Sequence, residues 1–411
     1  MRIGFLFNHD QPHQIAHSLP VALTLADMDP GATVLAAATN AILAAEVARL
    51  CAAHGASRVV QLELCLNSRV NRGLARLVDP LVPGAKLLVY RDNLDFFRSL
   101  DVLVVAEKTS LILKTRYGLN HLRMVYTSHG AGDRAIGFDA DTAHFDQLMA
   151  AGPKIRDRWI DESGADPAKI WITGYPKFDL APRAPVRLPL QHNGRPTVLY
   201  NPHPSPHLSS WYKQGRAVLD YFLASDRYNL IFAPHIMLFQ RKFVITVDRL
   251  AINRPGALDG KYREAPHIHI DLGSNASTDM TYTQAADIYL GDVSSQIYEF
   301  LIRPRPAVFL NTHRVGWRRD PDYAHWQAGP VIEDVAALDG ALERAQAQQA
   351  TFGPLQTRLF DHTFDLTREP SSRRVASAIL AALAGRQASN RRYSRNGRTA
   401  STDPLRVRRV R

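Results

Sequence analysis

The polar turn at residues 292–295 could bind a phosphate group. It follows the apolar residues 288–290, which predict a short buried strand, and precedes a helical pattern at residues 297–301. A helix N-terminus offers free backbone N–H groups and a partial positive charge, and the hydroxyls of Ser294 and Ser295 can donate to phosphate oxygens. We therefore interpret this turn as a phosphate-binding site, with simple helix capping by the two serines as the alternative.

Charged residues beside this turn have possible roles of their own. Asp292 is expected to cap the helix or organise the loop before it acts as a catalyst. Glu299 lies about one turn into the helix and could accept hydrogen bonds from ribose hydroxyls, unless it is an ordinary solvated glutamate. Arg303 and Arg305 flank the prolines that end the helix, and they could contact an anionic acceptor or simply be exposed.

Turns with glycine or histidine follow several other predicted strands. Because the carboxyl ends of parallel strands meet at one edge of a sheet, a single cleft could collect these turns together with Ser294. This convergence favours an enzyme. The residues concerned are His129, Gly174, His203 and His235, which come after strands expected at 124–127, 170–173, 197–200 and 229–232.

The spacing of the histidines also raises the question of a metal site. His9, His13 and His17 are four residues apart, and His203 and His207 repeat that spacing. Prolines lie inside both sets, so neither set forms one continuous helical face. No CxxC or HExxH motif accompanies them. The sequence therefore predicts no metal ion.

The elements that must position these residues alternate between strand and helix. This alternation predicts an α/β fold with parallel sheets covered on both faces, and residues 288–310 predict a βαβ unit with two parallel neighbouring strands. Further strands are expected at 2–7, 33–38, 58–64, 101–106 and 267–271, and the pattern continues through 74–81. Helices are expected at 13–27, 41–53, 93–100, 216–223, 336–349 and 373–384, the last of which could pack back on the first half of the chain.

Composition and length predict two domains and a basic tail. The 411 residues leave room for two cores, and residues 181–196, with four prolines, are the best linker between domains at 1–180 and 197–385. Residues 386–411 contain nine arginines and one acid, which accounts for +8 of the net charge of +11. This tail is expected to be disordered, and to bind an anionic membrane surface, nucleic acid without sequence preference, or no partner.

The two cysteines and the hydropathy pattern indicate in which cellular compartment the protein is expected. Cys51 and Cys65 are expected to be buried thiols in a reducing environment. The N-terminal apolar run is too short for a signal peptide, and no run of 18 apolar residues is present. We therefore expect a cytoplasmic protein.

The motifs together resemble the CDP-glycerol glycerophosphotransferases of teichoic acid and capsule synthesis. The similarity covers about residues 100–312, and the order of the motifs matches as well. It implies the GT-B architecture, in which two Rossmann-like domains face each other across the active site. The segments that carry it are SHGAGD at 128–133, TGYPKFD at 173–179, YNPHPS at 200–205, APH at 233–235 and DIYLGDVSSQIYEFLIRPRPAVFLN at 287–311.

The resemblance also implies roles for individual residues. His129 is similar to the family's base and His235 to a histidine that contacts the donor phosphates. Ser294 and Ser295 resemble the donor phosphate ligands, and Lys177 is a possible phosphate contact. Gly130 would let the backbone approach a ligand, and Asp179 is expected to help fix the turn between the domains. Gly291 and Val293 depart from the TDYSS sequence usual in the family.

The function that this resemblance implies is transfer of glycerol phosphate, or a similar polyol phosphate, from a CDP-activated donor. The acceptor would be a hydroxyl of a glycan or lipid-linked glycan, CMP would be released, and no cofactor would be needed. Such an enzyme is expected at the inner face of the plasma membrane. One alternative is a nucleotide-sugar glycosyltransferase or epimerase of the same fold, and another is a noncatalytic protein whose tail binds RNA or membrane.

Overall fold

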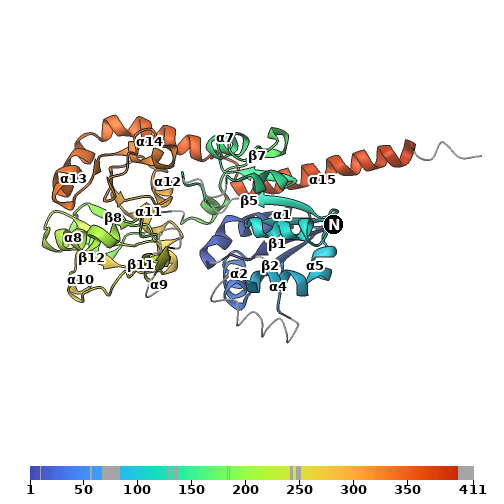
Figure 1. Cartoon of the computed structure of the whole chain (residues 1–411), viewed down its shortest axis with the longest axis horizontal. Helices are drawn as coiled ribbons and strands as arrows, with labels where there is room; N and C mark the ends of the chain where they lie inside the picture. Colours follow the sequence, from blue (N-terminus) through green and yellow to red (C-terminus); the bar gives the residue numbers. More distant parts are fainter. Residues whose placement is uncertain are drawn as a thin grey trace, which may run out of the picture.

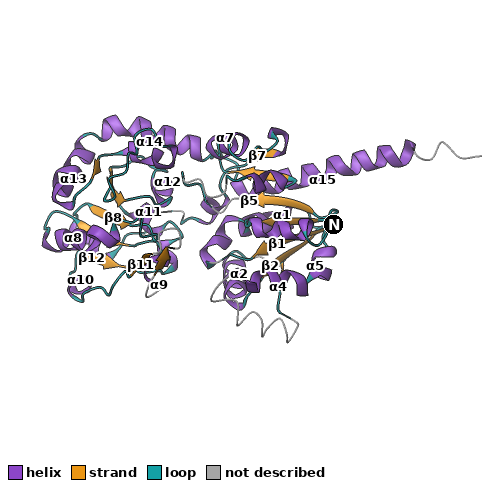
Figure 2. Ribbon diagram, viewed as in Figure 1, coloured by secondary structure: helices purple, strands orange, loops and turns teal. Residues whose placement is uncertain are grey.

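The computed structural model describes residues 1–9, 11–55, 58–66, 84–127, 130–133, 138–182, 184, 186–240, 244–246 and 251–396. Two lobes lie side by side, each with a parallel sheet inside a layer of helices (Figures 1 and 2). Each lobe has the strand order of a doubly wound fold, which confirms the predicted α/β class. The strand patterns predicted this arrangement because a strand buried on both faces must be apolar along its whole length.

The first sheet has seven parallel strands in the order β3-β2-β1-β4-β5-β6-β7. The central strand β4 is fully buried and β1 and β2 are buried after their first residue, while the edge strand β3 is mostly exposed. The strands are β1 (Arg2–Phe7), β2 (Thr33–Ala38), β3 (Val60–Glu63), β4 (Val102–Val105), β5 (Arg123–Thr127), β6 (Gln147–Ala150) and β7 (Ile170–Ile172).

The second sheet has six parallel strands in the order β12-β9-β8-β13-β14-β15. They are β8 (Thr197–Asn201), β9 (Asn229–Phe232), β12 (Ile268–Ile270), β13 (Ile288–Gly291), β14 (Ala307–Leu310) and β15 (Val331–Ile332). β13 and β14 are parallel neighbours, as predicted for the βαβ unit. A separate antiparallel pair is formed by β10 (Val244–Thr246) and β11 (Ala251–Asn253).

Helices cover both faces of each sheet (Figure 2). In the first lobe they are η1 (Pro12–His17), α1 (Leu19–Met28), α2 (Ala41–Ala53), α4 (Gly84–Asp92), α5 (Leu94–Arg98), η2 (Lys108–Leu111), α6 (Ile112–Thr115), η3 (Ala140–His144), α7 (Pro153–Asp161), η4 (Pro167–Lys169) and η5 (Pro176–Leu180). After η6 (Pro189–Asn193), the second lobe has α8 (Trp211–Ala224), α9 (Met237–Gln240), α10 (Lys261–Glu264), η8 (Asn275–Ser277), α11 (Thr281–Ala285), α12 (Gln296–Phe300), η9 (Pro321–Ala328), η10 (Val335–Ala337), α13 (Leu338–Ala347) and α14 (Gln349–Thr363).

The last helix, α15 (Ser371–Asn396), returns to the first lobe, as predicted for its first half. It packs against α1 through Val375, Ala376 and Ile379, which belong to the same buried cluster as β1 (Figure 1). The helix continues through residues 386–396, the first part of the tail for which the sequence predicts disorder. Residues 397–411 lie outside the described residues.

Some other sequence expectations differ from the structure. Cys51 is buried as predicted, but Cys65 is exposed because it follows β3 at the edge of the sheet. β6 was not predicted, and α14 forms although Gly353 and Pro354 discourage a helix. Gln356 of α14 donates hydrogen bonds to two backbone carbonyls of the second lobe, so tertiary contacts hold this helix in place. The predicted strand or helix at residues 74–81 lies outside the described residues.

Candidate functional site

A cavity of about 610 Å³ lies between the carboxyl ends of the two sheets. In both sheets the strand order reverses beside the first strand, at β1/β4 and at β8/β13, and turns that follow these strands line the cavity. Ligands of open α/β folds bind in the crevice at such positions. From the first lobe the lining includes His13, Glu107, Gly130, Asp133 and Lys177, and from the second His203, His235, Ser294, Ser295 and Glu299.

The turn after β13 is organised by Asp292, whose carboxylate is buried. Its Oδ1 accepts from the backbone N–H of His203 at 2.9 Å, and its Oδ2 accepts from the backbone N–H and the hydroxyl of Ser210 at 2.6 and 2.8 Å. Burial raises the pKa of Asp292 above its usual range, although these hydrogen bonds oppose that shift. Asp292 therefore organises the loop, as predicted, and is not part of the cavity lining.

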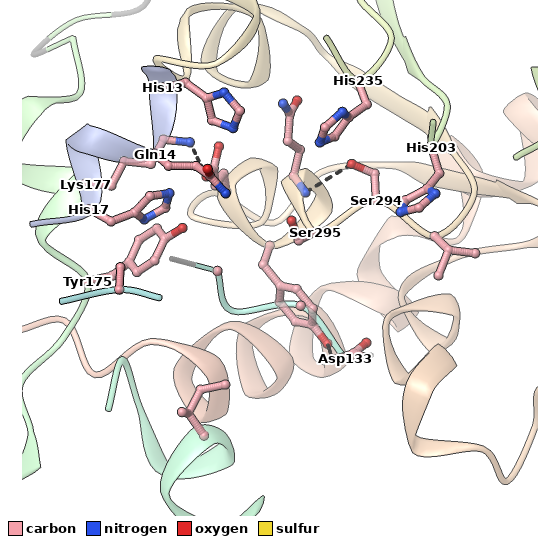
Figure 3. Close-up of a pocket in the computed structure, with 18 of the residues that line it drawn as sticks. His13, Gln14, His17, Asp133, Tyr175, Lys177, His203, His235, Ser294 and Ser295 are labelled. Atoms are coloured by element: carbon pink, nitrogen blue, oxygen red, sulfur yellow. Dashed lines mark hydrogen bonds and ion pairs between the residues drawn. The ribbon is translucent and has the colours of Figure 1, made fainter. Parts of the chain in front are cut away.

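The two serines of this turn differ in their surroundings. Ser294 is buried, and its Oγ accepts from the backbone N–H of Gln296 at 3.4 Å. Ser295 is the N-cap residue of α12, yet its exposed side chain makes no capping hydrogen bond. Its hydroxyl is therefore available to a ligand in the cavity (Figure 3). α12 has only five residues, so we assign the anion preference to the serine hydroxyls more than to a helix dipole.

His235 lies beside the serine turn, and its ring faces the cavity (Figure 3). Nδ1 accepts from the backbone N–H of Met237 at 3.3 Å, so the proton of the neutral ring is on Nε2. Burial, with a smaller contribution from Lys177, lowers the pKa of His235 to about 4. A neutral imidazole with an Nε2–H donor suits contact with a phosphate oxygen.

Two further histidine rings surround His235. The ring centroid of His13 lies 6.3 Å from that of His235, and the centroid of His203 lies 6.2 Å away on the other side. His13 comes from η1 of the first lobe, so the imidazoles meet across the cleft (Figure 3). The sequence flagged His13 and His17 only for a metal. Among the described residues, no group of three or more His, Cys, Asp or Glu side chains is arranged to hold a metal ion.

Lys177 and Glu299 form a buried ion pair between the lobes. Nζ of Lys177 lies 2.5 Å from Oε1 of Glu299, and both side chains are less than 10% exposed. Glu299 Oε2 is buried and has no hydrogen-bond partner in the described part of the chain. Both residues line the cavity, so Glu299 is not a solvated helix residue, and Oε2 can accept from a ligand hydroxyl.

The glycines of the SHGAGD and TGYPKFD segments differ in whether they lie at the cavity. Gly130 lines the cavity and has open space around its Cα, and a Cβ on Gly132 would lie 3.2 Å from Cβ of Ser295. Gly174 does not line this cavity. It has φ +82° and packs against Ser371, whose Oγ would lie 2.4 Å from an added Cβ. His129 lies outside the described residues.

The arginines after α12 and the aspartate of the TGYPKFD segment have structural contacts. Arg305 donates to the backbone carbonyls of Thr283 at 2.9 Å and Phe300 at 2.6 Å, and burial lowers its pKa to about 9. Neither Arg303 nor Arg305 lines the cavity, so an anionic acceptor there does not meet them. Asp179 accepts from the backbone N–H groups at the start of α15, which fixes the turn.

A carboxylate that sequence reasoning did not single out lies behind the serine turn. Asp133 is buried and accepts hydrogen bonds from Lys154, Tyr298 and His325. Burial opposes its ionisation, but Lys154 and His325 outweigh that effect and hold the pKa of Asp133 well below its usual range. The one available signal was its place at the end of the SHGAGD segment.

Comparison with known proteins confirms the architecture. No protein-family model and no curated protein matches the chain. A solved variant of the wall teichoic acid polymerase TagF aligns with 94% of this chain and 90% of its own, with a TM-score of 0.59 and 13% identity. A TagF variant soaked with CDPG aligns with 94% of this chain and 89% of its own, with a TM-score of 0.59 and 14% identity.

Nucleotide-sugar epimerases show the same similarity. UDP-GlcNAc 2-epimerase from Neisseria meningitidis, bound to UDP-GlcNAc, aligns with 94% of this chain and 100% of its own at a TM-score of 0.55 and 12% identity. S. aureus MnaA, solved with UDP, aligns with 93% and 97% at a TM-score of 0.53 and 11% identity. These neighbours confirm the GT-B fold, and at such low identity the similarity extends to the fold alone.

Proposed function

We propose that this chain transfers glycerol phosphate, or a similar polyol phosphate, from a CDP-activated donor to a hydroxyl of a glycan or lipid-linked glycan. One observation carries the proposal. Ser295 and His235 of the second lobe and Gly130 of the first lobe line a single cavity of about 610 Å³. A cavity of this size accepts a nucleotide-sized ligand.

The reaction would be an in-line displacement at phosphorus. The acceptor oxygen forms a bond to the phosphorus that bears the polyol, the bond from that phosphorus to the CMP oxygen breaks, and CMP leaves with the bonding electron pair. Ser294, Ser295 and the Nε2–H of His235 would donate to the departing phosphate, and their position in the cavity lining supports this role. Glu299 would accept from ribose hydroxyls through Oε2, while Lys177 holds its other oxygen.

The acceptor hydroxyl must lose a proton during attack. We assign that proton to His129, on its resemblance to the family's base and on the position of Gly130, the next residue in the chain, at the cavity. Gly130 leaves room for the acceptor or a phosphate to come close. No metal or cofactor is part of this proposal.

The deciding experiment is a donor panel. The protein is incubated with CDP-glycerol, CDP-ribitol and several UDP-sugars, and the freed nucleotide is identified. Release of CMP from a CDP-polyol supports the proposal, and His129→Ala should then slow release by about 10² or more. Release of UDP, or epimerisation of the sugar, would instead identify the nucleotide-sugar alternative.

Ser295→Ala tests the phosphate contact without disturbing the fold. The hydroxyl makes no capping bond, so stability should change little, while the affinity for CDP should fall about fivefold to tenfold. Ser225→Ala is a suitable control, since Ser225 ends α8 outside the cavity lining. Equal CDP affinity of Ser295→Ala and the parent would remove Ser295 from the site.

A peripheral membrane location is part of the proposal. No described helix meets the length and hydropathy needed to cross a bilayer. Residues 397–411 carry five arginines and one aspartate, and each basic residue near an anionic surface contributes about 1 kcal/mol. Sedimentation with vesicles that contain 30% anionic lipid, by the full chain and by a chain ending at residue 396, tests this attachment.

A further inference from the structure

Asp133 joins the glycine segment of the first lobe to a buried cation. Lys154 Nζ lies 2.9 Å from Asp133 Oδ1 and also donates to the backbone carbonyl of Ala131 at 2.7 Å. The side chains of Asp133 and Lys154 are 1% and 10% exposed. Lys154 of α7 therefore holds residues 130–133 in place through these two contacts.

The same carboxylate is held by two residues of the second lobe. Tyr298 donates its hydroxyl to Asp133 Oδ1 at 2.6 Å, and His325 donates its backbone N–H to Oδ2 at 3.0 Å. The ring Nδ1 of His325 lies 2.7 Å from that same oxygen. All of these partners belong to α12 and η9, so Asp133 connects the lobes directly.

His325 extends the connection to the serine turn. Its Nε2 lies 3.0 Å from the backbone oxygen of Asp292, and the indole Nε1 of Trp326 donates to the same oxygen at 2.7 Å. The His325 ring thus lies between the carboxylate of Asp133 and the backbone oxygen of Asp292, the residue that organises the turn.

We propose that Asp133 is a positioning residue that locks residues 130–132 against the serine turn at 292–295. It sets the distance between the group that attacks and the group that holds the departing phosphate, and this part of the inference rests on the proposed function. Gly132 already approaches Ser295 so closely that a Cβ would lie 3.2 Å from its Cβ, so a small shift of either segment changes the reacting geometry.

Asp133 is expected to affect turnover more than donor binding. The hydrogen bonds of Asp133 to the second lobe come from Tyr298 and His325 rather than from the residues proposed to bind the donor, so its loss should affect donor binding less than turnover. Alignment of the acceptor with the donor does require Asp133, because acceptor and donor are held by different lobes. Loss of Asp133 should therefore lower kcat more than it raises the KM for the donor.

Hydrogen exchange tests the lock without any substrate. In Asp133→Asn the amide would keep the shape but lose the charge, and we expect faster exchange both in residues 130–133 and in residues 292–300 of the other lobe. Asp220→Asn is the matched control, because Asp220 also accepts from a lysine and a tyrosine, Lys261 and Tyr262, but within one lobe. Faster exchange confined to the first lobe would overturn the lock.

Kinetics then test the consequence, with the donor that the panel identifies. We expect Asp133→Asn to lower kcat at least about tenfold and to change the donor KM by less than about threefold. Tyr298→Phe removes one hydroxyl and should have a smaller effect of the same kind. The double variant should be no slower than Asp133→Asn, because both changes act through one contact. Independent, multiplying effects would contradict the proposal.

The role of Asp133 and the proposed transferase function can be rejected independently of each other. If no nucleotide is released from any donor, the transferase proposal is wrong, and the exchange pattern alone decides whether Asp133 couples the lobes. If Asp133→Asn does not fold, Tyr298→Phe and His325→Gln carry both measurements, and unchanged exchange across the lobes in both would end the inference.

Discussion

The two walls of the cavity are built in different ways. In the second lobe, the turn that carries the serines is organised from within its own lobe, because Asp292 binds the backbone at His203 and Ser210. In the first lobe, Asp133 and Lys177 depend in part on residues of the opposite lobe, Tyr298 and Glu299. Gln11 likewise pairs with Gln240 across the cleft.

This difference divides the work of the site between its walls. A wall that is organised within its own lobe can bind a ligand whether or not the lobes are closed. A wall that is organised by the other lobe reaches its final geometry only on closure. We expect the second lobe to determine donor affinity and the contacts between lobes to determine turnover.

The largest loss of stability is expected when the buried ion pair between the lobes is broken. Lys177→Met would leave Glu299 as a buried carboxylate without its cation, and the free energy of unfolding should fall by about 4 kcal/mol. The double variant Lys177→Met/Glu299→Gln should recover a large part of that loss. Urea denaturation of both variants measures it, and a single variant as stable as the double would show that the pair is not buried in solution.

The next largest loss of stability is expected at Asp292 of the second lobe. Asp292→Asn replaces two ionised oxygens that hold His203 and Ser210 with one carbonyl oxygen, and it should lower the free energy of unfolding by about 3 kcal/mol. Affinity for CDP should fall more than for any change in the first lobe. Calorimetric titration with CDP measures it, with Asp220→Asn as the control carboxylate on the surface of the same lobe.

A pH effect should follow from His235 of the same wall. Its folded pKa, about 4, lies below the unfolded value near 6.5, so the folded state binds fewer protons between these values. The stability it contributes is complete above pH 6.5, is lost as the pH falls toward 4, and amounts to about 2 to 3 kcal/mol. His235→Gln should flatten the pH dependence of unfolding in this window, whereas exposed His144→Gln should leave it unchanged.

The smallest loss of stability is expected for the exposed contact between Gln11 and Gln240. Gln11→Ala removes an exposed amide pair with Gln240, which should cost about 0.5 kcal/mol or less in unfolding free energy. Small-angle scattering with and without CDP should still detect a wider average separation of the lobes. A stability loss as large as that of Lys177→Met would contradict the ranking of the two contacts.

The local elements were predictable because each depends on a short stretch of sequence. β1, β2 and β9 have the predicted bounds, since a strand covered on both faces is a continuous apolar run. Asp292 and Asp179 organise turns as expected, but the backbone groups that they bind lie 89 and 193 positions away, which the local sequence does not indicate. β6 and α14 escaped prediction. β6 is a short run that begins with the polar Gln147, and α14 contains Gly353 and Pro354, which discourage a helix.

The sequence by itself determined the α/β class, the parallel strands and the convergence of polar turns at strand ends, because hydropathy period and turn residues act over a few neighbours. Only the tertiary structure decided the partners. Glu299 meets Lys177, 122 positions away, and Asp133 meets His325, 192 positions away. The packing of two lobes brings these charges together, and no local pattern encodes which buried cation a carboxylate will face.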